Sequence, residues 1–190
     1  MRQLLSRAEN PAARGGPRPV GRVSVAVAAD KKERELIFRL RYRIYVEEMG
    51  RRLKAADHKR RLLRDDLDDW GLLFYARAGR EVVGTVRLHV GARDAFPPEL
   101  AQPLAMDRFG EFYPAGGPPP PLSFLSKVMV DSQFRGSKIL NILIVALCEE
   151  CRRQGILMNF LGCAPHLVAL YEHLGFRRYK SNFFVPEYGY

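Results

Sequence analysis

The sequence predicts a single α/β or α+β domain in which helices flank a mixed β-sheet, and three observations lead to this fold class. Segments in which apolar residues alternate with polar ones, as in strands, are interleaved with segments in which apolar residues recur every three or four positions, as in helices. A length of 190 residues with 47% hydrophobic and 27% charged residues suits one domain. The sequence contains no internal repeat.

The chain divides into a flexible basic tail at 1–22 and a folded domain at 23–190. The tail is rich in Arg, Pro, Gly and Ala and has no apolar period. It lacks the apolar middle of a secretory signal, and an organelle transit peptide is the alternative interpretation. No apolar run approaches the roughly 20 residues that cross a bilayer, so we expect a cytoplasmic protein.

The domain is expected to begin with a strand at 23–28, where valine alternates with smaller residues. Asp30 follows as the candidate N-cap of a helix over 31–49. The apolar residues of this helix lie three or four positions apart: Leu36, Ile37, Leu40, Ile44 and Tyr45. The same spacing places Arg41 and Glu48 on one face together with Tyr45.

The middle of the chain is expected to form a hairpin and a long connection. Strands at 72–77 and 82–90 flank a turn that contains Gly79. Residues 92–121 hold eight of the thirteen prolines, which predicts a connection with one helical turn near Met106. Connections of this length in a compact domain are usually functional or disordered.

The C-terminal half continues the alternation of strands and helices. Strands are predicted at 122–130 and 156–161, with an amphipathic helix between them. A last helix over 165–174 and a terminal hairpin that pairs 176–179 with 183–186 complete the domain.

The charge balance is unusual, because 31 Lys and Arg residues against 21 Asp and Glu residues leave a net charge of +10. The segment 31–64 contains thirteen basic and five acidic side chains, a net charge of +8. The sign then reverses at Asp65, Asp66, Asp68 and Asp69. A positive field confined to one segment predicts a docking face for a polyanion, such as nucleic acid, an anionic membrane or a small acidic protein.

The segment 128–139 is predicted to run from a strand through a short loop into the start of a helix that Ser137 caps. Unpaired amide groups and the positive end of the helix dipole bind anions at such a place. Gly136 lets a phosphate approach the backbone closely, and Arg135 and Lys138 add positive charge. An ordinary turn with two solvated basic side chains is the alternative interpretation.

The cysteines and histidines do not suggest a metal or a thiol mechanism. Cys148 and Cys151 lie within one turn of a predicted helix without a second ligand pair, and the four histidines have no ligand spacing. Cys163 precedes Pro165 and His166, but a buried inert thiol is commoner than a Cys/His nucleophile. We therefore expect no metal, no disulfide framework and a reducing compartment.

Two motifs resemble the GNAT acyltransferase superfamily. Gln133-x-x-Gly136-x-Lys138 is similar to its pantetheine- and phosphate-binding loop, whose pattern is Gln/Arg-x-x-Gly-x-Gly/Ala. The segment 170–177, LYEHLGFR, resembles its closing helix, strand and turn. The resemblance implies a GNAT-like fold over 23–190 with a mostly antiparallel central sheet. It also implies an acyl donor carried on phosphopantetheine and no tightly bound cofactor.

A second set of motifs resembles the branch that contains acyl-homoserine lactone synthases and, more closely, long-chain N-acyl amino acid synthases. These motifs are RYRIYVEEM at 41–49, DDLDD at 65–69, VGTVRL at 83–88 and the pair Ser126-Lys127. Enzymes of that branch transfer an acyl chain from acyl carrier protein to an amino group of an amino acid or derivative. The resemblance covers about residues 25–180 and implies the same activity, with acyl carrier protein and an amino acid as partners.

Three features depart from these family patterns. Lys138 stands where most GNAT members have Gly or Ala, and it would crowd the pyrophosphate of coenzyme A but could pair with the single phosphodiester of a carrier protein. An outward-pointing Lys138 is the alternative. Phe124 stands where lactone synthases have a Glu, so the expected general base is missing. The segment 95–121 fits no strict pattern, and we expect chain-length or acceptor specificity there.

Acyl transfer from a thioester needs a neutral amine, a hydrogen-bond donor for the oxyanion and a proton for the thiolate. The resemblance places the thioester carbonyl near the backbone N–H groups from Val128 to Val130 and makes Tyr171 the candidate proton donor, with a core aromatic as the alternative for Tyr171. The amine's proton would pass to water, to Glu48 or to an acidic residue near Asp68; Glu48 is alternatively a helix-surface partner of an arginine. The implied donor-binding residues are Val130, Gln133, Arg135, Gly136, Ser137, Lys138 and Ile139.

The carboxylate of an amino acid acceptor is expected to contact Arg41 and Arg87 through bidentate hydrogen bonds. The resemblance adds Ser126 to this acceptor-binding group. Arg87 lies in an apolar strand, where an unpaired guanidinium is costly to bury. It therefore meets a ligand or an acidic partner, and Asp68 and Asp69 are the candidates.

The sequence as a whole favours an N-acyltransferase that moves a fatty acyl group from acyl carrier protein to an amino acid. A GNAT N-acetyltransferase that uses acetyl-CoA or another acyl-CoA on a small amine or protein is the first alternative. A nucleic-acid-binding protein is the second, but no helix-turn-helix, zinc module or array of stacking aromatics accompanies the charge, so no nucleic acid is expected. Peripheral contact with membrane lipid through the product or the basic tail is a further expectation.

Overall fold

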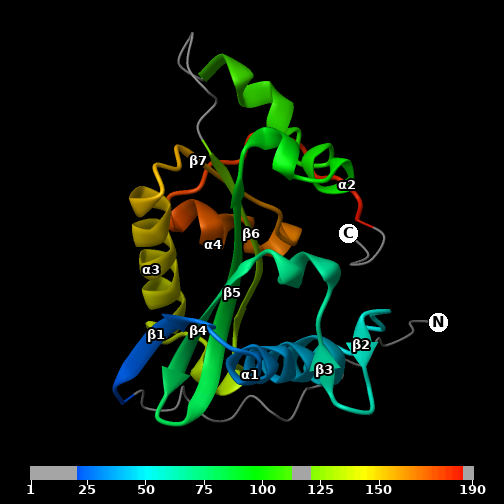
Figure 1. The fold of residues 1–190 in the computed structure, drawn as a ribbon, viewed down its shortest axis with the longest axis vertical. Helices are drawn as coiled ribbons and strands as arrows, with labels where there is room; N and C mark the ends of the chain where they lie inside the picture. Colours follow the sequence, from blue (N-terminus) through cyan, green and yellow to red (C-terminus); the bar gives the residue numbers. More distant parts are fainter. Residues whose placement is uncertain (1–20, 113–120, 186–190) are drawn as a thin grey trace, which may run out of the picture.

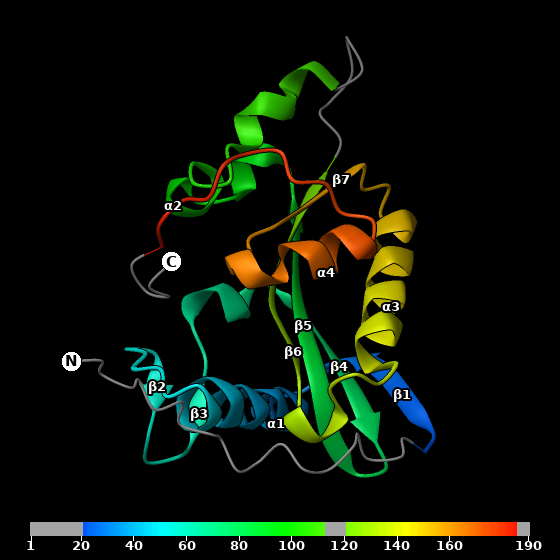
Figure 2. The same ribbon diagram turned by 180° about the vertical axis from the view of Figure 1, so that it is seen from behind.

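A computed structural model describes residues 21–112 and 121–185. A five-stranded sheet runs through the middle of the molecule and carries helices on both faces (Figures 1 and 2). This arrangement confirms the predicted fold class. The tail predicted at 1–22 lies outside the described residues except for Gly21 and Arg22. Within the described ranges, no helix is long and apolar enough to cross a membrane.

The central sheet is mixed and mostly antiparallel. Its strands are β1 (Val23–Val27), β4 (Leu72–Ala78), β5 (Glu81–Gly91), β6 (Leu122–Val130) and β7 (Met158–Leu161), and they lie in the order β1-β4-β5-β6-β7. Each neighbouring pair is antiparallel except β6 and β7, which are parallel. All five strands were expected from apolar alternation.

A separate hairpin of β2 (Ala56–Asp57) and β3 (Leu62–Leu63) was not expected. Each of its strands has only two residues, so no alternation of apolar and polar side chains can be detected. The hairpin lies beside α1 (Lys31–Tyr42), against which β3 packs.

The start of α1 is capped as predicted. The Asp30 carboxylate accepts the Glu33 amide hydrogen at 2.9 Å, and the Glu33 carboxylate accepts the Ala29 amide hydrogen at 2.8 Å. These reciprocal bonds satisfy two of the amide groups that a helix start leaves open.

The helix predicted over 31–49 changes its winding after Tyr42. Residues Arg43–Glu48 form a π-helix, in which the Met49 amide donates to the carbonyl of Ile44 at 3.0 Å. Such wide turns occur often at functional sites, and apolar spacing alone does not reveal them. The π-helix brings both Arg43 and Glu48 to the loop that follows β6, where each forms an ion pair.

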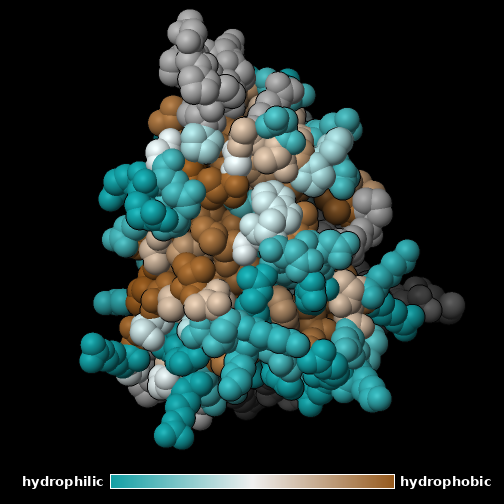
Figure 3. Space-filling model, in the orientation of Figure 1, coloured by the Kyte–Doolittle hydropathy of each residue, from teal (hydrophilic) through white to brown (hydrophobic). Residues whose placement is uncertain are grey.

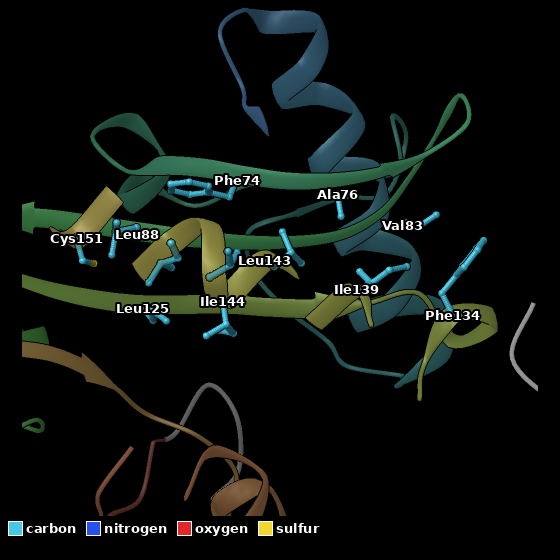
Figure 4. Close-up of a cluster of buried hydrophobic side chains, with 12 residues drawn as sticks. Phe74, Ala76, Val83, Leu88, Leu125, Phe134, Ile139, Leu143, Ile144 and Cys151 are labelled. Atoms are coloured by element: carbon cyan, nitrogen blue, oxygen red, sulfur yellow. The ribbon is translucent and has the colours of Figure 1, made fainter. Parts of the chain in front are cut away.

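Each face of the sheet packs against one long helix. On one face, α3 (Ile139–Arg153) covers the largest apolar cluster (Figure 4). Its fully buried members include Ala76, Val86, Leu88, Ile139, Leu143 and Leu147. On the opposite face, α1 packs over a second cluster that includes Ile37, Leu40, Leu73, Tyr75 and Met129.

The connection after β5 is more ordered than predicted. It contains short helical turns at 93–95 and 106–112 and the helix α2 (Pro98–Ala101), so the turn expected near Met106 is confirmed. Residues 113–120 of the connection lie outside the described part of the chain. Its apolar side chains form a third cluster with the end of the sheet: Phe96, Leu104, Met106, Leu122, Phe124 and Phe160.

The terminal hairpin predicted at 176–179 and 183–186 is wrong over the residues that the structure describes, because 176–185 contain no strand. This segment follows α4 (Val168–His173), which completes the last predicted helix. Tyr179 and Phe183 of this segment pack on the third cluster. Tyr179 donates a hydrogen bond to the carbonyl of Leu104, and Lys180 donates to that of Pro103 at 2.6 Å.

Gly84 of β5 sets how closely α3 approaches the sheet, which leads to a first prediction. A Cβ atom at this position would lie 2.9 Å from Ile139 Cγ2 and 3.0 Å from Leu143 Cδ1. Gly84→Ala is therefore expected to lower the free energy of unfolding by about 1–3 kcal/mol, measured by urea denaturation. Gly162→Ala is the control, because its nearest neighbour would be Leu104 Cδ2 at 3.9 Å. Equal stability of the two variants would contradict the prediction.

Candidate active site

The edge of β6 is open over the second half of the strand. Pairing between β6 and β7 ends at Leu125 and Leu161, while β6 continues to Val130 (Figure 2). The backbone groups on this side of 126–130 therefore have no strand partner within the described ranges. Open backbone donors and acceptors of this kind suit an extended ligand that carries amide groups.

A β-bulge marks the point where β6 opens. The register between β5 and β6 shifts between Thr85 and Arg87, and the non-glycine residue Lys127 has a φ of +52°. Because one extra residue is inserted, the side chains after the bulge change faces. Val128 and Val130 pack towards α3, where Leu125 also lies.

The bulge directs Lys127 towards the α1 face. Its Nζ lies 3.1 Å from Asp65 Oδ2 and 5.4 Å from the ring centre of Tyr45. Sequence reasoning did not select Lys127 as a site residue. A charged residue inside the apolar segment 122–130 was the available signal, and the positive φ that orients it cannot be detected in the sequence.

Val128 and Val130 lie in the open half of β6, and contact of their backbone with the donor stays a prediction. Their side chains are half-buried against α3, and their backbone groups belong to the open half of β6. The Asp131 amide donates to Val83 of β5 at 2.8 Å, so the preceding carbonyl of Val130 points to the opposite edge. Arg135 Nε donates to that carbonyl at 3.2 Å.

The loop between β6 and α3 is the segment in which an anion site was predicted, and we call residues 136–141 the anion cradle. Gly136 has a φ of +78°, and no atom lies within 4 Å of the position that its Cβ would take. The amide groups of Gly136, Lys138, Leu140 and Asn141 donate no hydrogen bond to any residue that the structure describes. Free amide groups at and just before the start of a 15-residue helix suit an anion, and binding of the donor phosphate here stays a prediction.

The predicted donor-binding residues of this loop differ in exposure. Gln133, Arg135 and Lys138 are exposed, whereas Ile139 is completely buried and offers only its backbone to a ligand. Lys138 occupies the N-cap position that we expected for Ser137, but Ser137 Oγ still accepts the amide hydrogen of Ile139 at 3.4 Å. The Ser137 hydroxyl also donates to the carbonyl of Phe134 at 2.6 Å, since the loop tightens into a short turn before the helix.

Two ion pairs connect the π-helix to this loop. Arg43 pairs with Asp131 at the start of the loop, and Glu48 pairs with Arg135 further along it. A cavity of about 360 Å³ lies between them, lined by Arg43, Glu47, Glu48, Asp131 and Gln133 among others. The structure thus brings Glu48 to the donor loop, and its role as a proton acceptor stays a prediction.

Tyr171 of α4 is buried and protonated. Burial raises the pKa of its hydroxyl well above the ordinary value, and the neighbouring Cys163 and Tyr45 act in the same direction. Its ring meets Phe176 edge to face, with 5.8 Å between the ring centres. A protonated phenol fits the predicted proton donor, and the packing fits the core aromatic, so both interpretations of Tyr171 remain.

The predicted acceptor-binding residues lie in a buried charge network. Asp68 Oδ1 accepts hydrogen bonds from Arg41 at 2.7 Å and from Arg87 at 2.9 Å. Arg87 also pairs with Asp65 and donates to Ser126 Oγ at 2.9 Å. Of the two candidate partners, Arg87 thus pairs with Asp68. Direct contact of either arginine with an acceptor stays a prediction.

The network keeps its carboxylates ionised. Burial by itself would raise the pKa of Asp65, but Arg87 and Lys127 outweigh it and lower the pKa to about 2. Burial likewise opposes ionisation of Asp68, and Arg41 and Arg87 hold its pKa below the ordinary value. The side chain of Asp65 is 26% exposed, whereas that of Asp68 is fully buried. Asp65 is therefore the part of the network that a ligand can reach.

Phe124, which stands where the resemblance predicts a glutamate base, lies beside His89. Phe124 stacks on His89 with 6.1 Å between the ring centres. Burial lowers the pKa of His89 to about 4, so the ring is neutral near pH 7. Its Nε2 donates to the carbonyl of Leu67 at 2.7 Å. His89 therefore supports the segment around Asp68 and does not supply a solvent-accessible base.

Among residues 21–112 and 121–185, no three His, Cys, Asp or Glu side chains are close enough to hold a metal ion. Cys148, Cys151 and Cys163 are free thiols, and burial raises the pKa of Cys163. A thiolate nucleophile is correspondingly disfavoured at this position.

The network supplies a second prediction, with a matched control in the next acidic residue. Asp68→Asn leaves Arg41 and Arg87 buried beside a neutral amide and is expected to lower the free energy of unfolding by about 3–5 kcal/mol. Asp69 pairs with Arg64, and both side chains are more than half exposed. Asp69→Asn should change stability by less than about 1 kcal/mol. Chemical denaturation of both variants checks this, and similar losses would contradict a special role for Asp68.

Solved structures show the same architecture. They include an acetyltransferase from Trypanosoma brucei, with a TM-score of 0.57, 16% identity, and coverage of 86% of this chain and 99% of that chain. A predicted acetyltransferase with acetyl-CoA from Clostridium acetobutylicum has a TM-score of 0.59 and 15% identity, with 86% and 96% coverage. Glucosamine-6-phosphate N-acetyltransferase from Arabidopsis thaliana has a TM-score of 0.56 and 11% identity, with 87% and 98% coverage. Identities this low show a shared GNAT fold alone.

The family comparison is more specific. The model of one family, described as N-acyl amino acid synthase FeeM, matches residues 36–190. No curated protein matches the chain significantly. The matched residues include the π-helix, the charge network, the open edge of β6 and the anion cradle. The chain therefore belongs to the N-acyl amino acid synthase FeeM family and is a GNAT-superfamily acyltransferase.

Proposed function

We propose that the protein transfers a fatty acyl group from acyl carrier protein to the amino group of an amino acid. The observation that carries this proposal is the open edge of β6 directly beside the cradle of free amide groups, in a member of an N-acyl amino acid synthase family. An acyl-pantetheine arm has a phosphate at one end, two amide groups along its length and a thioester at the other end. The cradle and the open edge suit these groups in that order.

The donor occupies the loop and then the strand. Its phosphodiester accepts hydrogen bonds from the free amide groups at the start of α3, while Arg135 and Lys138 supply charge. The arm follows the open edge of β6 and places the thioester carbonyl near the backbone of Val128 and Val130. Backbone N–H groups there stabilise the oxyanion that develops during attack. Lys138, which is exposed, is compatible with this single phosphodiester.

The acceptor lies on the α1 side of the open edge, near Arg87 and Ser126. Asp65 is ionised and partly exposed, which suits it to hold the ammonium group of an amino acid. Arg41 has no exposed surface and acts by holding Asp68 in place. The side chain of Arg87 is only 2% exposed and likewise holds Asp65 and Asp68 in place, so the acceptor contacts the network through Asp65.

The acyl transfer proceeds by attack of the amino group on the thioester. The acceptor ammonium loses a proton to water, and its nitrogen attacks the thioester carbonyl. A C–N bond forms, the nitrogen loses its second proton to water, and the C–S bond breaks with its electron pair passing to sulfur. Tyr171 donates its phenolic proton to the departing thiolate and regains a proton from solvent.

The basic segment 31–64 supplies the docking face for the acidic carrier protein, although only part of it is available. Several of its cations already have acidic partners, namely Arg39 and Arg60 with Glu35, Arg43 with Asp131, Arg61 with Glu47 and Arg64 with Asp69. Arg52, Lys54 and Lys59 are exposed and form no ion pair with the described residues. Figure 3 shows hydrophilic side chains gathered over the end of the molecule that contains α1 and the β2–β3 hairpin.

Acyl-CoA is the alternative donor, and one observation favours it. The similar fold from Clostridium acetobutylicum was solved with acetyl-CoA. Turnover of a fatty acyl carrier protein and of the matching acyl-CoA separates the two donors, and a clear preference for acyl-CoA would overturn the carrier-protein proposal. Mass spectrometry of lipids from an expressing bacterial host identifies the amino acid and the chain length together.

The docking face leads to a third prediction. Replacing Arg52 and Lys54 by Glu should raise the KM for acyl carrier protein about tenfold at low salt and leave the KM for acyl-phosphopantetheine within about twofold. The control replaces Arg80 and Arg177, which are exposed and lie outside 31–64, and should leave both values close to wild type. Equal losses with both donors would show that Arg52 and Lys54 support the fold instead.

Tyr171 supplies a fourth prediction, because its two interpretations give different kinetics. Tyr171→Phe keeps the ring that packs on Phe176 and removes the proton. If Tyr171 protonates the thiolate, kcat should fall about a hundredfold or more while the KM for the donor stays within about twofold. Steady-state kinetics at saturating acceptor provide the measurement. An unchanged kcat would leave Tyr171 as a packed aromatic alone.

A further inference from the structure

We propose that Arg135 and Glu48 form a latch on the open edge of β6, which a phosphate-bearing donor releases and a donor without phosphate does not. The inference rests on the proposed function, since it concerns how the donor enters the same site. It assigns to Glu48 the part of a positioning residue that acts through Arg135.

The Arg135 side chain covers part of the open edge of β6. Its Nε donates to the carbonyl of Val130 at 3.2 Å, and this carbonyl points to the edge that β7 does not cover. Its guanidinium also pairs with Glu48 of the π-helix. The side chain therefore lies along the path that the proposal gives to the pantetheine arm. The same contact occupies the carbonyl of Val130, which an amide group of the arm needs as a hydrogen-bond acceptor.

The two ion pairs between the π-helix and the loop differ in the exposure of their carboxylates. Asp131, which pairs with the 54% exposed Arg43, is only 10% exposed and also accepts the Gln133 amide hydrogen at 3.0 Å. In the other pair, Arg135 is 49% exposed and Glu48 is 33% exposed. A pair so open to water is weak and exchangeable. The Arg43 pair thus anchors the π-helix, and the Arg135 pair is the one that can open.

A phosphate bound in the anion cradle opens the ion pair between Arg135 and Glu48. Arg135 lies next to Gly136, the first of the free amide groups that form the anion cradle. A phosphate in the cradle competes with Glu48 for the same guanidinium and offers charge-assisted, bidentate hydrogen bonds. When Arg135 moves to the phosphate, the carbonyl of Val130 becomes available to the arm. A donor without phosphate must break the same contacts and gains nothing from Arg135.

This mechanism makes the effect of removing Arg135 depend on the ligand. Arg135→Ala deletes both the latch and a phosphate contact. Binding of 4′-phosphopantetheine should weaken about five- to tenfold, because the lost contact is charge-assisted. Binding of pantetheine, which lacks the phosphate, should strengthen about two- to fivefold, the range that corresponds to an exposed ion pair. A residue that only supports the loop would weaken both ligands.

Glu48→Gln isolates the latch, because Arg135 remains. Both ligands should bind about two- to fivefold more tightly than to the wild-type protein. Glu47→Gln is the matched control: Glu47 lies next to Glu48 on the same π-helix and pairs with Arg61, and it forms no ion pair with the described residues of the loop. It should leave both dissociation constants unchanged. Glu48→Asp, which keeps the charge, should restore binding towards the wild-type values.

The experiment is calorimetric titration of the full chain and its variants with 4′-phosphopantetheine and with pantetheine, with circular dichroism to confirm folding. Opposite shifts for the two ligands in Arg135→Ala support the latch. Weakened or unchanged binding of pantetheine in that variant overturns it, as does Glu48→Gln with wild-type dissociation constants. A Glu48→Gln variant that loses kcat at an unchanged donor KM also overturns it and makes Glu48 a proton acceptor.

The failures of the two proposals can be told apart. If acyl transfer from carrier protein occurs but the two ligands shift together, the proposed function stands and the latch is wrong. If the ligands shift in opposite directions but no acyl transfer is found with any amino acid, the latch stands and the proposed function is wrong. If neither ligand binds the wild-type protein, the phosphate cradle and the latch are both wrong.

Discussion

The position of the candidate site depends on one buried carboxylate, that of Asp68, between the guanidinium groups of Arg41 and Arg87. None of these three charges can stay in the interior without the others, because an unpaired buried charge costs several kcal/mol. Since Arg41 comes from α1 and Arg87 from β5, the contact holds a helix, a strand and the segment 65–69 in one arrangement. Arg87 extends it to Ser126, and Asp65 extends it to Lys127 at the bulge of β6. The open edge is therefore positioned by electrostatics as well as by apolar packing.

The two sides of the open edge use charge in different ways. On the acceptor side, the ion pairs are buried, several groups share them, and the pKa of Asp65 is held near 2, which makes them permanent supports. On the donor side, the pair between Arg135 and Glu48 faces water, where such pairs contribute little and exchange readily. A rigid acceptor side and an exchangeable donor side suit the proposed function, in which the donor binds and leaves at each turnover.

Local patterns predicted most of the fold. The strands β4, β5 and β6 and the helix α3 follow from apolar periods, and the anion cradle follows from Gly136 and two cations at the start of a helix. Patterns failed where distant residues decide the outcome. The helix over 31–49 ends in a π-helix whose ion pairs involve residues 131 and 135, and the expected terminal hairpin is replaced by packing on the residues around Leu104. Short-range periodicity contains no information about either partner.

By itself, the sequence determined the class of fold, the strand–loop–helix order over 128–139 and the need for an acidic partner of Arg87, because each depends on neighbouring residues or on the cost of burying a single charge. Only the tertiary structure decided that this partner is Asp68 and that Lys127 turns towards Asp65. It also placed Glu48 on Arg135 at the edge of β6. These outcomes depend on which elements lie side by side, and a bulge of one residue is enough to reverse the face on which a side chain lies.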